Sequence, residues 1–174
     1  MVALRVTLSR VTALAQISAG GATYAVRRAV PADVLPIVEL TVADQIGTPR
    51  DDPSDPAPYL AAFEAIDADP AHLLVVATDG AGDIVATLQL AFIPGIARRG
   101  GTRAQIEAVR VRSDLRSRGI GGALIEWAVE QARERGCALV QLTSNKARAD
   151  AHRFYGRLGF SATHEGFKLK LVAE

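Results

Sequence analysis

The chain has 174 residues, 49% of them hydrophobic and 22% charged, and a formal net charge of +1. These values are typical of one globular domain with a full core and exclude a mainly disordered chain. No run reaches the roughly 18 apolar residues of a membrane span, and residues 1–20 lack a clear signal-peptide core. The single cysteine, Cys137, excludes an intrachain disulfide and a cysteine-based metal cluster. We therefore expect a cytoplasmic protein without a metal centre or a membrane partner.

Charge is segregated along the chain although its sum is near zero. Between residues 31 and 70, nine acidic residues stand against Arg50 alone. Between residues 98 and 118, seven arginines stand against Glu107 and Asp114. The first segment should attract cations and the second anions, unless both are ordinary solvated surfaces. The small number of aromatic residues, the lack of a basic excess and the lack of a recognised module argue against nucleic-acid binding.

The first half of the chain predicts a strand, two helices and then a hairpin. Residues 1–22 are an N-terminal extension whose pattern does not choose between a strand, a helix and a loose segment, and residues 23–174 form one domain. A loop at 47–58, with four prolines, separates the two helices. The predicted strands are 24–30, 72–78 and 84–93, and the predicted helices are 31–42 and 59–66.

The second half predicts a long helix between two strands, followed by a short helix and two final strands. Trp127 lies on the apolar face of the long helix, and Cys137 opens an apolar strand, so we expect a core tryptophan and a buried thiol. The order of elements implies an α/β (α+β) fold with a mixed sheet and helices on both faces. The predicted strands are 102–111, 138–143, 160–163 and 167–172, and the predicted helices are 120–135 and 149–158.

The strand at 102–111 contains a break in its alternation. Apolar residues occupy one parity up to Ala108 and the other parity from Val109 onward. A β-bulge has this effect, because one extra residue reverses the faces and frees a backbone N–H from the ladder. A fully buried strand end would give a similar pattern.

A glycine-rich turn, Arg116 to Gly122, connects this strand to the long helix. A helix N-terminus after such a turn presents unpaired N–H groups and partial positive charge, which suit a phosphate or a diphosphate. The Gly-Lys-Ser/Thr ending of a Walker loop is absent. A dinucleotide fingerprint is also a poor match, because Leu124 stands where its third glycine belongs.

These residues together resemble the GNAT superfamily of N-acetyltransferases. Ile106 to Val111 is similar to the fourth strand of the family, and Arg116-x-x-Gly119-x-Gly121 is similar to its pyrophosphate loop. The run Ala151 to Phe160, with its Phe-Tyr and Gly-Phe pairs, resembles the late helix of the family. The resemblance covers about residues 72–172, and it implies a mostly antiparallel sheet of six to seven strands.

The resemblance implies acetyl-CoA as the co-substrate, held in a V-shaped gap between the strands at 104–111 and 138–143. One position departs from the family pattern, because Arg148 stands where many members have an asparagine that contacts the cofactor. Asn145, three residues earlier, is the alternative contact. The expected cofactor contacts are Val109, Arg110, Val111, Arg116, Ser117, Arg118, Gly119, Ile120, Gly121, Gly122, Asn145 and Arg148.

Acetyl transfer to an amine needs a proton acceptor, because an alkyl ammonium has a reference pKa near 10, and a donor for the leaving thiolate. Glu107, a lone acid in a mainly apolar strand, is the candidate base, directly or through a water; the alternative is an acid that points to solvent. Tyr155 is the candidate acid by its match to the late motif, and otherwise it would be a core residue. His152 and His164 are weaker alternatives. No Ser-His-Asp set is discernible, so we expect direct attack without an acetyl-enzyme.

The acceptor is expected to be a small, cationic primary amine, because the first two helices and their loop often line the acceptor site in this family and here they are acidic. Two alternatives stay open. One is a catalytically silent acyl-CoA-binding regulatory module, and the other is a protein lysine or N-terminal acetyltransferase. Superfamily members are often homodimers, which is the expected assembly.

Overall fold

The computed structural model describes residues 12–44, 51–169 and 171. They form one six-stranded sheet in the order β1 to β6, antiparallel throughout except for the parallel pair β5–β6. The strands are β1 (Ala13–Ala19), β2 (Ala22–Arg28), β3 (His72–Thr78), β4 (Ile84–Ile93), β5 (Arg103–Val111) and β6 (Leu139–Leu142). The helices are α1 (Val34–Val42), α2 (Ala57–Ala68), α3 (Ala97–Gly100), α4 (Ile120–Glu134) and α5 (Ala149–Arg157), with 3-10 turns η1 (Pro31–Asp33) and η2 (Ser113–Leu115).

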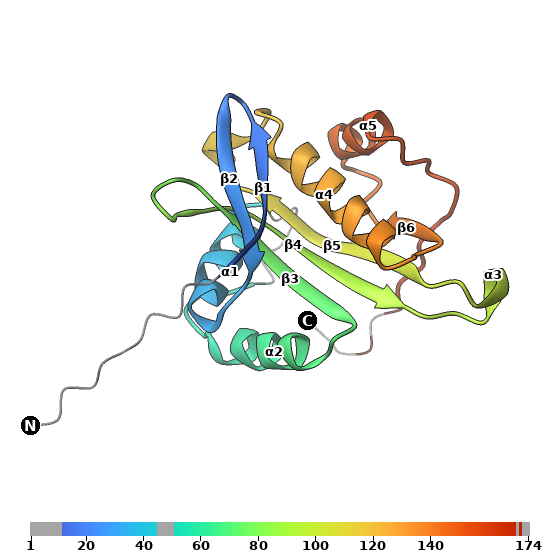
Figure 1. Ribbon diagram of the computed structural model, residues 1–174. Helices are drawn as coiled ribbons and strands as arrows, with labels where there is room; N and C mark the ends of the chain where they lie inside the picture. Colours follow the sequence, from blue (N-terminus) through green and yellow to red (C-terminus); the bar gives the residue numbers. More distant parts are fainter. Residues whose placement is uncertain (1–11, 45–50, 170, 172–174) are drawn as a thin grey trace, which may run out of the picture.

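Helices cover both faces of the sheet, as the order of elements predicts (Figure 1). The larger core lies between the sheet and α4, where Leu124, Ile125 and Trp127 are buried. The apolar positions of α4 recur at helical spacing, so one face packs on the strands while the opposite face stays in water. A smaller cluster, which includes Val38 and Phe63, joins α1 and α2 to the other face. The predicted core position of Trp127 is confirmed.

The N-terminal residues from Ala13 onward form a strand, one of the alternatives that the sequence left open. β1 and β2 make a hairpin through Gly20 and Gly21, both with positive φ, as a tight turn requires. Ile17 and Tyr24 are buried in the larger core, and β1 contacts α4. This strand adds an edge that the predicted order of elements does not contain.

The two predicted C-terminal strands, 160–163 and 167–172, are wrong within the described residues 160–169 and 171, which have no strand. Phe167, Leu169 and Leu171 are 95%, 86% and 89% exposed. Alternation produces a strand only where a sheet edge and an apolar surface accept it, and here the described residues beyond Phe160 are all exposed and pair with no strand. Residues 170 and 172, and 45–50 of the proline-rich loop, lie outside the described part of the chain.

Candidate functional site

β5 bulges at the predicted position. Glu107 pairs with Gln89 and Arg110 with Thr87, so β5 advances by three residues while β4 advances by two. Ala108 has a φ of 52°, a backbone conformation that is uncommon for a residue with a side chain. The extra residue turns β5 and releases part of its backbone from the ladder.

The other edge of β5 is unpaired over the same stretch. The β5–β6 ladder runs from Arg103↔Leu139 to Ile106↔Leu142 and stops there, while β5 continues to Val111. The described strands therefore supply no partner for residues 107–111 on this side, which is the geometry expected of a V-shaped gap. The carbonyl oxygen of Val109 accepts from Arg110 Nη1 at 2.8 Å, and that of Val111 accepts from Arg116 Nε at 3.3 Å.

The turn after η2 ends at Gly119, which caps α4 with a φ of 87° and without a side-chain hydrogen bond. The first helical bond is donated by the N–H of Ala123 to the carbonyl of Gly119 at 3.0 Å. For the N–H groups of residues 117–122, no acceptor is present in the parts of the chain that the structure describes. Ser117, Arg118 and Gly119 are exposed. Free donors at a helix N-terminus fit a diphosphate, whose oxygens only accept.

The three loop glycines differ in what their positions require. Gly119 needs its left-handed conformation. A Cβ at Gly121 would lie 3.5 Å from Val111 Cγ2 and 3.6 Å from Phe154 Cζ, which is ordinary contact distance. Gly122 would similarly meet Leu158 at 3.9 Å. A methyl group would therefore fit at Gly121 and at Gly122, and the packing of α4 against β5 and α5 does not itself require glycine at either position.

Tyr155 lies on α5 in a partly apolar environment. Its ring packs against Phe154, with centroids 5.1 Å apart, and against Phe160, at 6.0 Å. Burial raises the pKa of the Tyr155 phenol, an effect that the charges of Arg110 and Arg148 partly offset. The phenol is therefore protonated throughout the neutral range, as a proton donor must be.

Glu107 is exposed and takes part in a short chain of side-chain hydrogen bonds. Gln105 Nε2 donates to Glu107 Oε1 at 3.0 Å, and Gln141 Nε2 donates to Gln105 Oε1 at 2.7 Å. This chain connects β5 to β6 and orients the carboxylate without withdrawing it from water.

Asp44, at the end of α1, is the centre of an arginine cluster. Arg148 Nη2 lies 2.8 Å from Asp44 Oδ2 and 2.5 Å from the Asp44 carbonyl oxygen. Arg116 Nη2 lies 3.2 Å from Asp44 Oδ1, and Arg110 Nε lies 3.6 Å from Oδ2. Arg110 Nε is buried, and the described residues offer it no hydrogen bond. Three guanidinium groups around one carboxylate leave an excess of positive charge beside Tyr155.

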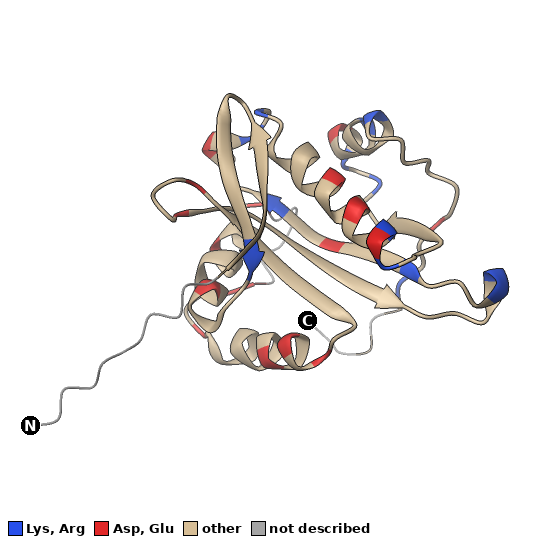
Figure 2. Ribbon diagram, viewed as in Figure 1, with Lys and Arg blue, Asp and Glu red and all other residues tan. Residues whose placement is uncertain are grey.

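The charges elsewhere follow the segregation seen in the sequence. Figure 2 shows acidic positions along α1 and α2 and basic positions on α3. Of the acidic segment 31–70, Asp44 is the residue in the arginine cluster, and its carboxylate is paired with Arg148. The sequence pattern did not reveal this pairing, because Asp44 and Arg148 are separated by 104 residues.

The other candidate residues lie near the start of α5. Asn145 Oδ1 accepts from the N–H of Ala147 at 2.9 Å, which closes a turn before the helix. His152 Nε2 lies 3.0 Å from the carbonyl oxygen of Asn145. The guanidinium of Arg148 points to Asp44, and His164 lies against Thr163. Asn145 and His152 therefore shape the turn into α5.

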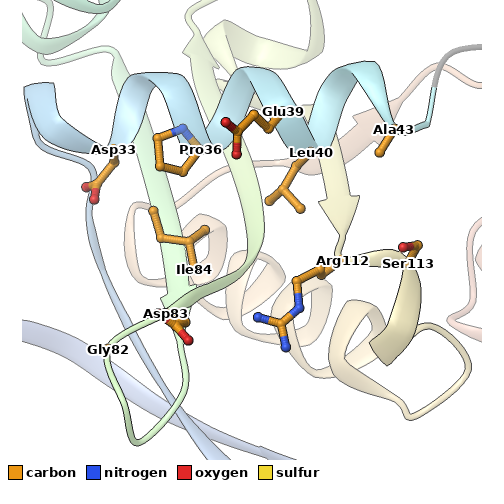
Figure 3. Close-up of a pocket in the computed structure, with 10 residues that line it drawn as sticks. All are labelled: Asp33, Pro36, Glu39, Leu40, Ala43, Gly82, Asp83, Ile84, Arg112 and Ser113. Carbon is orange, nitrogen blue, oxygen red and sulfur yellow. The ribbon is translucent and has the colours of Figure 1, made fainter. Parts of the chain in front are cut away.

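A separate pocket of about 540 Å³ lies between α1, the start of β4 and the end of β5 (Figure 3). Its walls include Glu39, Asp83 and Arg112. Asp33, also in its wall, makes a two-pronged ion pair with Arg27 at 2.6 Å and 2.9 Å. Glu107, Tyr155 and the loop glycines do not line it, so this pocket is distinct from the gap beside β5.

The family of the chain follows from its similarity to known proteins. The sequence profile of the acetyltransferase (GNAT) family matches residues 38–160. This range holds the second half of α1, the bulge, the glycine turn and α5. The chain therefore belongs to the GNAT acetyltransferase family, and the predicted fold class is confirmed. Within the described residues, no helix is long and apolar enough to cross a bilayer.

Several individual proteins are similar. An aminoalkylphosphonate N-acetyltransferase of Salmonella typhimurium is 41% identical over 63 residues, which are 36% of this chain and 41% of that protein. An uncharacterised N-acetyltransferase of Methanocaldococcus jannaschii is 46% identical over 57 residues, 33% of this chain and 25% of that protein. The matches thus span less than half the length of these curated relatives.

Two solved structures are similar over nearly their whole length. One, described as a transcriptional regulator from Bacillus halodurans, has a TM-score of 0.78 and 42% identity, covering 85% of this chain and 99% of that chain. The other, a putative acetyltransferase from Agrobacterium tumefaciens, has a TM-score of 0.73 and 30% identity, covering 83% and 98%.

Proposed function

We propose that this protein transfers an acetyl group from acetyl-CoA to a small primary amine, by direct attack while both substrates are bound. One observation carries the proposal. The unpaired edge of β5, at residues 107–111, continues into the free N–H groups of residues 117–122. A pantetheine arm needs an extended backbone to lie along, and a diphosphate needs a cluster of donors, so this edge and turn match both parts of one ligand.

Acetyl-CoA supplies the activated thioester, and the chain's part is to hold and orient it. The N–H groups of residues 117–122 would hold the diphosphate, with Arg116 and Arg118 as nearby positive charges. The carbonyl oxygens of Val109 and Val111 already accept from arginine side chains. The N–H groups of the same two residues would therefore be the ones that bond the pantetheine arm. Asn145 stays a proposed cofactor contact before α5. Arg148 is the alternative cofactor contact, but its guanidinium points to Asp44, which favours a role on the acceptor side.

Tyr155 would donate the proton that the leaving thiolate takes, because its raised pKa keeps the phenol protonated. Glu107 would accept the proton of the incoming ammonium, directly or through a water, since it is a solvent-accessible carboxylate on the bulged strand. The two groups approach the reaction centre from different elements, β5 and α5.

The acceptor that fits best is an amine with an anionic group at its other end, such as an aminoalkylphosphonate. The expectation of a small, cationic acceptor depended on the acidic segment 31–70. The one residue of this segment in the site is Asp44, whose carboxylate forms ion pairs with Arg110, Arg116 and Arg148. Three guanidinium groups exceed the charge of one carboxylate, so positive charge remains to bind an anion. The name of the Salmonella relative points to the same chemistry.

A panel of amines assayed by free-thiol release tests the proposal. The panel should hold aminoalkylphosphonates, aminosugar phosphates, amino acids, polyamines and a lysine peptide. We expect turnover with the anionic amines and least with polyamines. Turnover with the lysine peptide alone would support a protein acetyltransferase instead. If no amine caused thiol release, the proposed acetyltransferase activity would be contradicted.

A regulatory module without turnover is the second candidate, because the Bacillus halodurans neighbour is described as a transcriptional regulator. Calorimetry separates the two. Binding of acetyl-CoA without thiol release across the panel would favour the regulatory module, whereas binding with release favours the enzyme.

A further inference from the structure

The tip of the β1–β2 hairpin touches the glycine turn that precedes α4. A Cβ at Gly20 would lie 3.1 Å from both Cβ and the carbonyl oxygen of Arg118. A Cβ at Gly119 would lie 3.7 Å from Cβ of Ala19. Figure 1 shows the hairpin tip beside the gold-coloured turn at the start of α4. The two turns are therefore in direct contact, although about 100 residues separate them.

The hairpin is anchored firmly enough to act as a support. β1 and β2 pair from Ala19↔Ala22 toward their other ends, and Ile17 is 7% exposed in the core beside α4. β2 pairs with β3 only through residues 25–28, so the tip extends past β3 toward the turn. Nothing in the sequence pattern of residues 13–24 predicts this contact.

The turn itself has a backbone that needs support. Ser117 has a φ of 62° and Gly119 a φ of 87°, and left-handed backbone at a residue with a side chain is costly. Such a conformation persists when the surrounding structure holds it. On one side Arg116 Nε binds the carbonyl of Val111, and on the other the hairpin tip lies against Arg118.

We propose that the β1–β2 hairpin is part of the diphosphate site, and that its tip at Ala19 and Gly20 holds the Arg118 peptide so that the N–H groups of the turn converge before the ligand arrives. The identity of the ligand rests on the proposed function. The match to the family profile begins at residue 38, so the hairpin lies outside the matched residues. A preorganised turn binds more tightly, because less ordering is needed on binding.

Gly20→Ala tests this proposal, with Gly21→Ala as its matched control. Both glycines lie in the same turn with positive φ, at 57° and 79°, so alanine strains the backbone at both. Only the Cβ at position 20 meets the turn, because a Cβ at Gly21 has nothing within 4 Å. Calorimetry with CoA should give a Kd at least roughly fivefold weaker for Gly20→Ala, and a Kd near the wild-type value for Gly21→Ala.

Amide exchange of residues 116–123 without ligand provides a second readout. We expect faster exchange in Gly20→Ala and wild-type exchange in Gly21→Ala. Equal changes in Kd for the two variants, or unchanged exchange in Gly20→Ala, would overturn the proposal. If the wild-type protein binds no CoA, the proposed function fails, while the exchange measurement still decides whether the hairpin supports the turn.

Should Gly20→Ala unfold the hairpin, Ala19→Val replaces it. Valine suits a strand and adds bulk toward Gly119 without left-handed strain at its own position. The same weakening of CoA binding and the same faster exchange of residues 116–123 are expected, and wild-type values of both would contradict the proposal.

Discussion

One half of the candidate site is built from backbone groups, and the other half is built from charged side chains. The proposed cofactor half, along β5 and the turn before α4, consists mainly of backbone groups: an unpaired strand edge and free N–H donors. The proposed acceptor half, around Asp44, consists of side-chain charges from β5, from the segment after α1 and from the segments before α4 and α5. The backbone half follows from local conformation, whereas the charged half exists only where distant segments meet.

This difference predicts how each half responds to substitution. A backbone site is sensitive to φ and to steric support, and tolerant of side chains that point to solvent. A charged site is sensitive to each ion pair that it loses, because the partner groups stay behind without compensation. Variants in one half should therefore change the KM of one substrate alone, and variants at the reaction centre should change kcat.

The largest effect is expected for Tyr155→Phe, at the meeting point of the two halves. Loss of a general acid should lower kcat by about 10³, with smaller changes in either KM. Burial raises the pKa of the phenol, so wild-type activity should decline only at pH above the ordinary tyrosine value, and the variant should lack that alkaline decline. A pH–rate profile measures both. Wild-type kcat in the variant would remove Tyr155 from the mechanism.

Glu107→Gln should lower kcat by about 10², at the lower end for a general base because the carboxylate is exposed and can be partly replaced by water. Glutamine preserves the contact with Gln105, so the sheet is not disturbed. An unchanged rate and pH profile would show that Glu107 is a solvated surface acid.

Arg148→Ala tests the charged half. The KM for an anionic amine should rise about thirtyfold, since a hydrogen bond to a charged group contributes roughly 1.5–3 kcal/mol, while the KM for acetyl-CoA changes little. Arg112→Ala is the control. Arg112 lies just after β5, pairs with Asp114 and does not contact Asp44. Equal effects of the two variants would refute a specific anion subsite. A rise confined to acetyl-CoA would instead make Arg148 a cofactor contact.

Gly119→Ala tests the backbone half. Forcing alanine into a φ of 87° costs about 1–2 kcal/mol, so the KM for acetyl-CoA should rise about tenfold while the KM for the amine stays constant. Gly136→Ala, just past the other end of α4, is the matched control, because its φ of 67° is also left-handed and a Cβ there has nothing within 4 Å. If both variants bind acetyl-CoA like wild type, the turn does not grip the cofactor.

The smallest effect is expected outside both halves. Phe167→Ser should change the free energy of unfolding by less than about 0.5 kcal/mol, because this side chain is 95% exposed. Chemical denaturation measures the change, and light scattering at the same time tests the expected homodimer. A large loss of stability, or a dimer in wild type that becomes a monomer in the variant, would show that the C-terminal segment is covered in solution.

Much of the fold was accessible from local pattern. The strands at 72–78 and 84–93 were predicted to the residue, because long apolar runs flanked by turn residues leave little choice of register. The bulge at Ala108 was visible as a change of parity, and the glycine turn as a break before a helical pattern. The predicted strands 160–163 and 167–172 failed, because alternation alone does not provide a sheet edge.

The sequence by itself determined most of the elements from β2 to α5, the bulge, the glycine turn and the resemblance to the family, since each depends on residues within a few positions of one another. The tertiary structure decided which distant segments meet: Asp44 lies among Arg110, Arg116 and Arg148, and the hairpin tip at residues 19–20 lies against the turn at 118–119. The physical reason is the different range of the interactions along the chain. Backbone conformation is set by neighbouring residues, whereas ion pairs and steric contacts depend on distances in space that chain separation does not reveal.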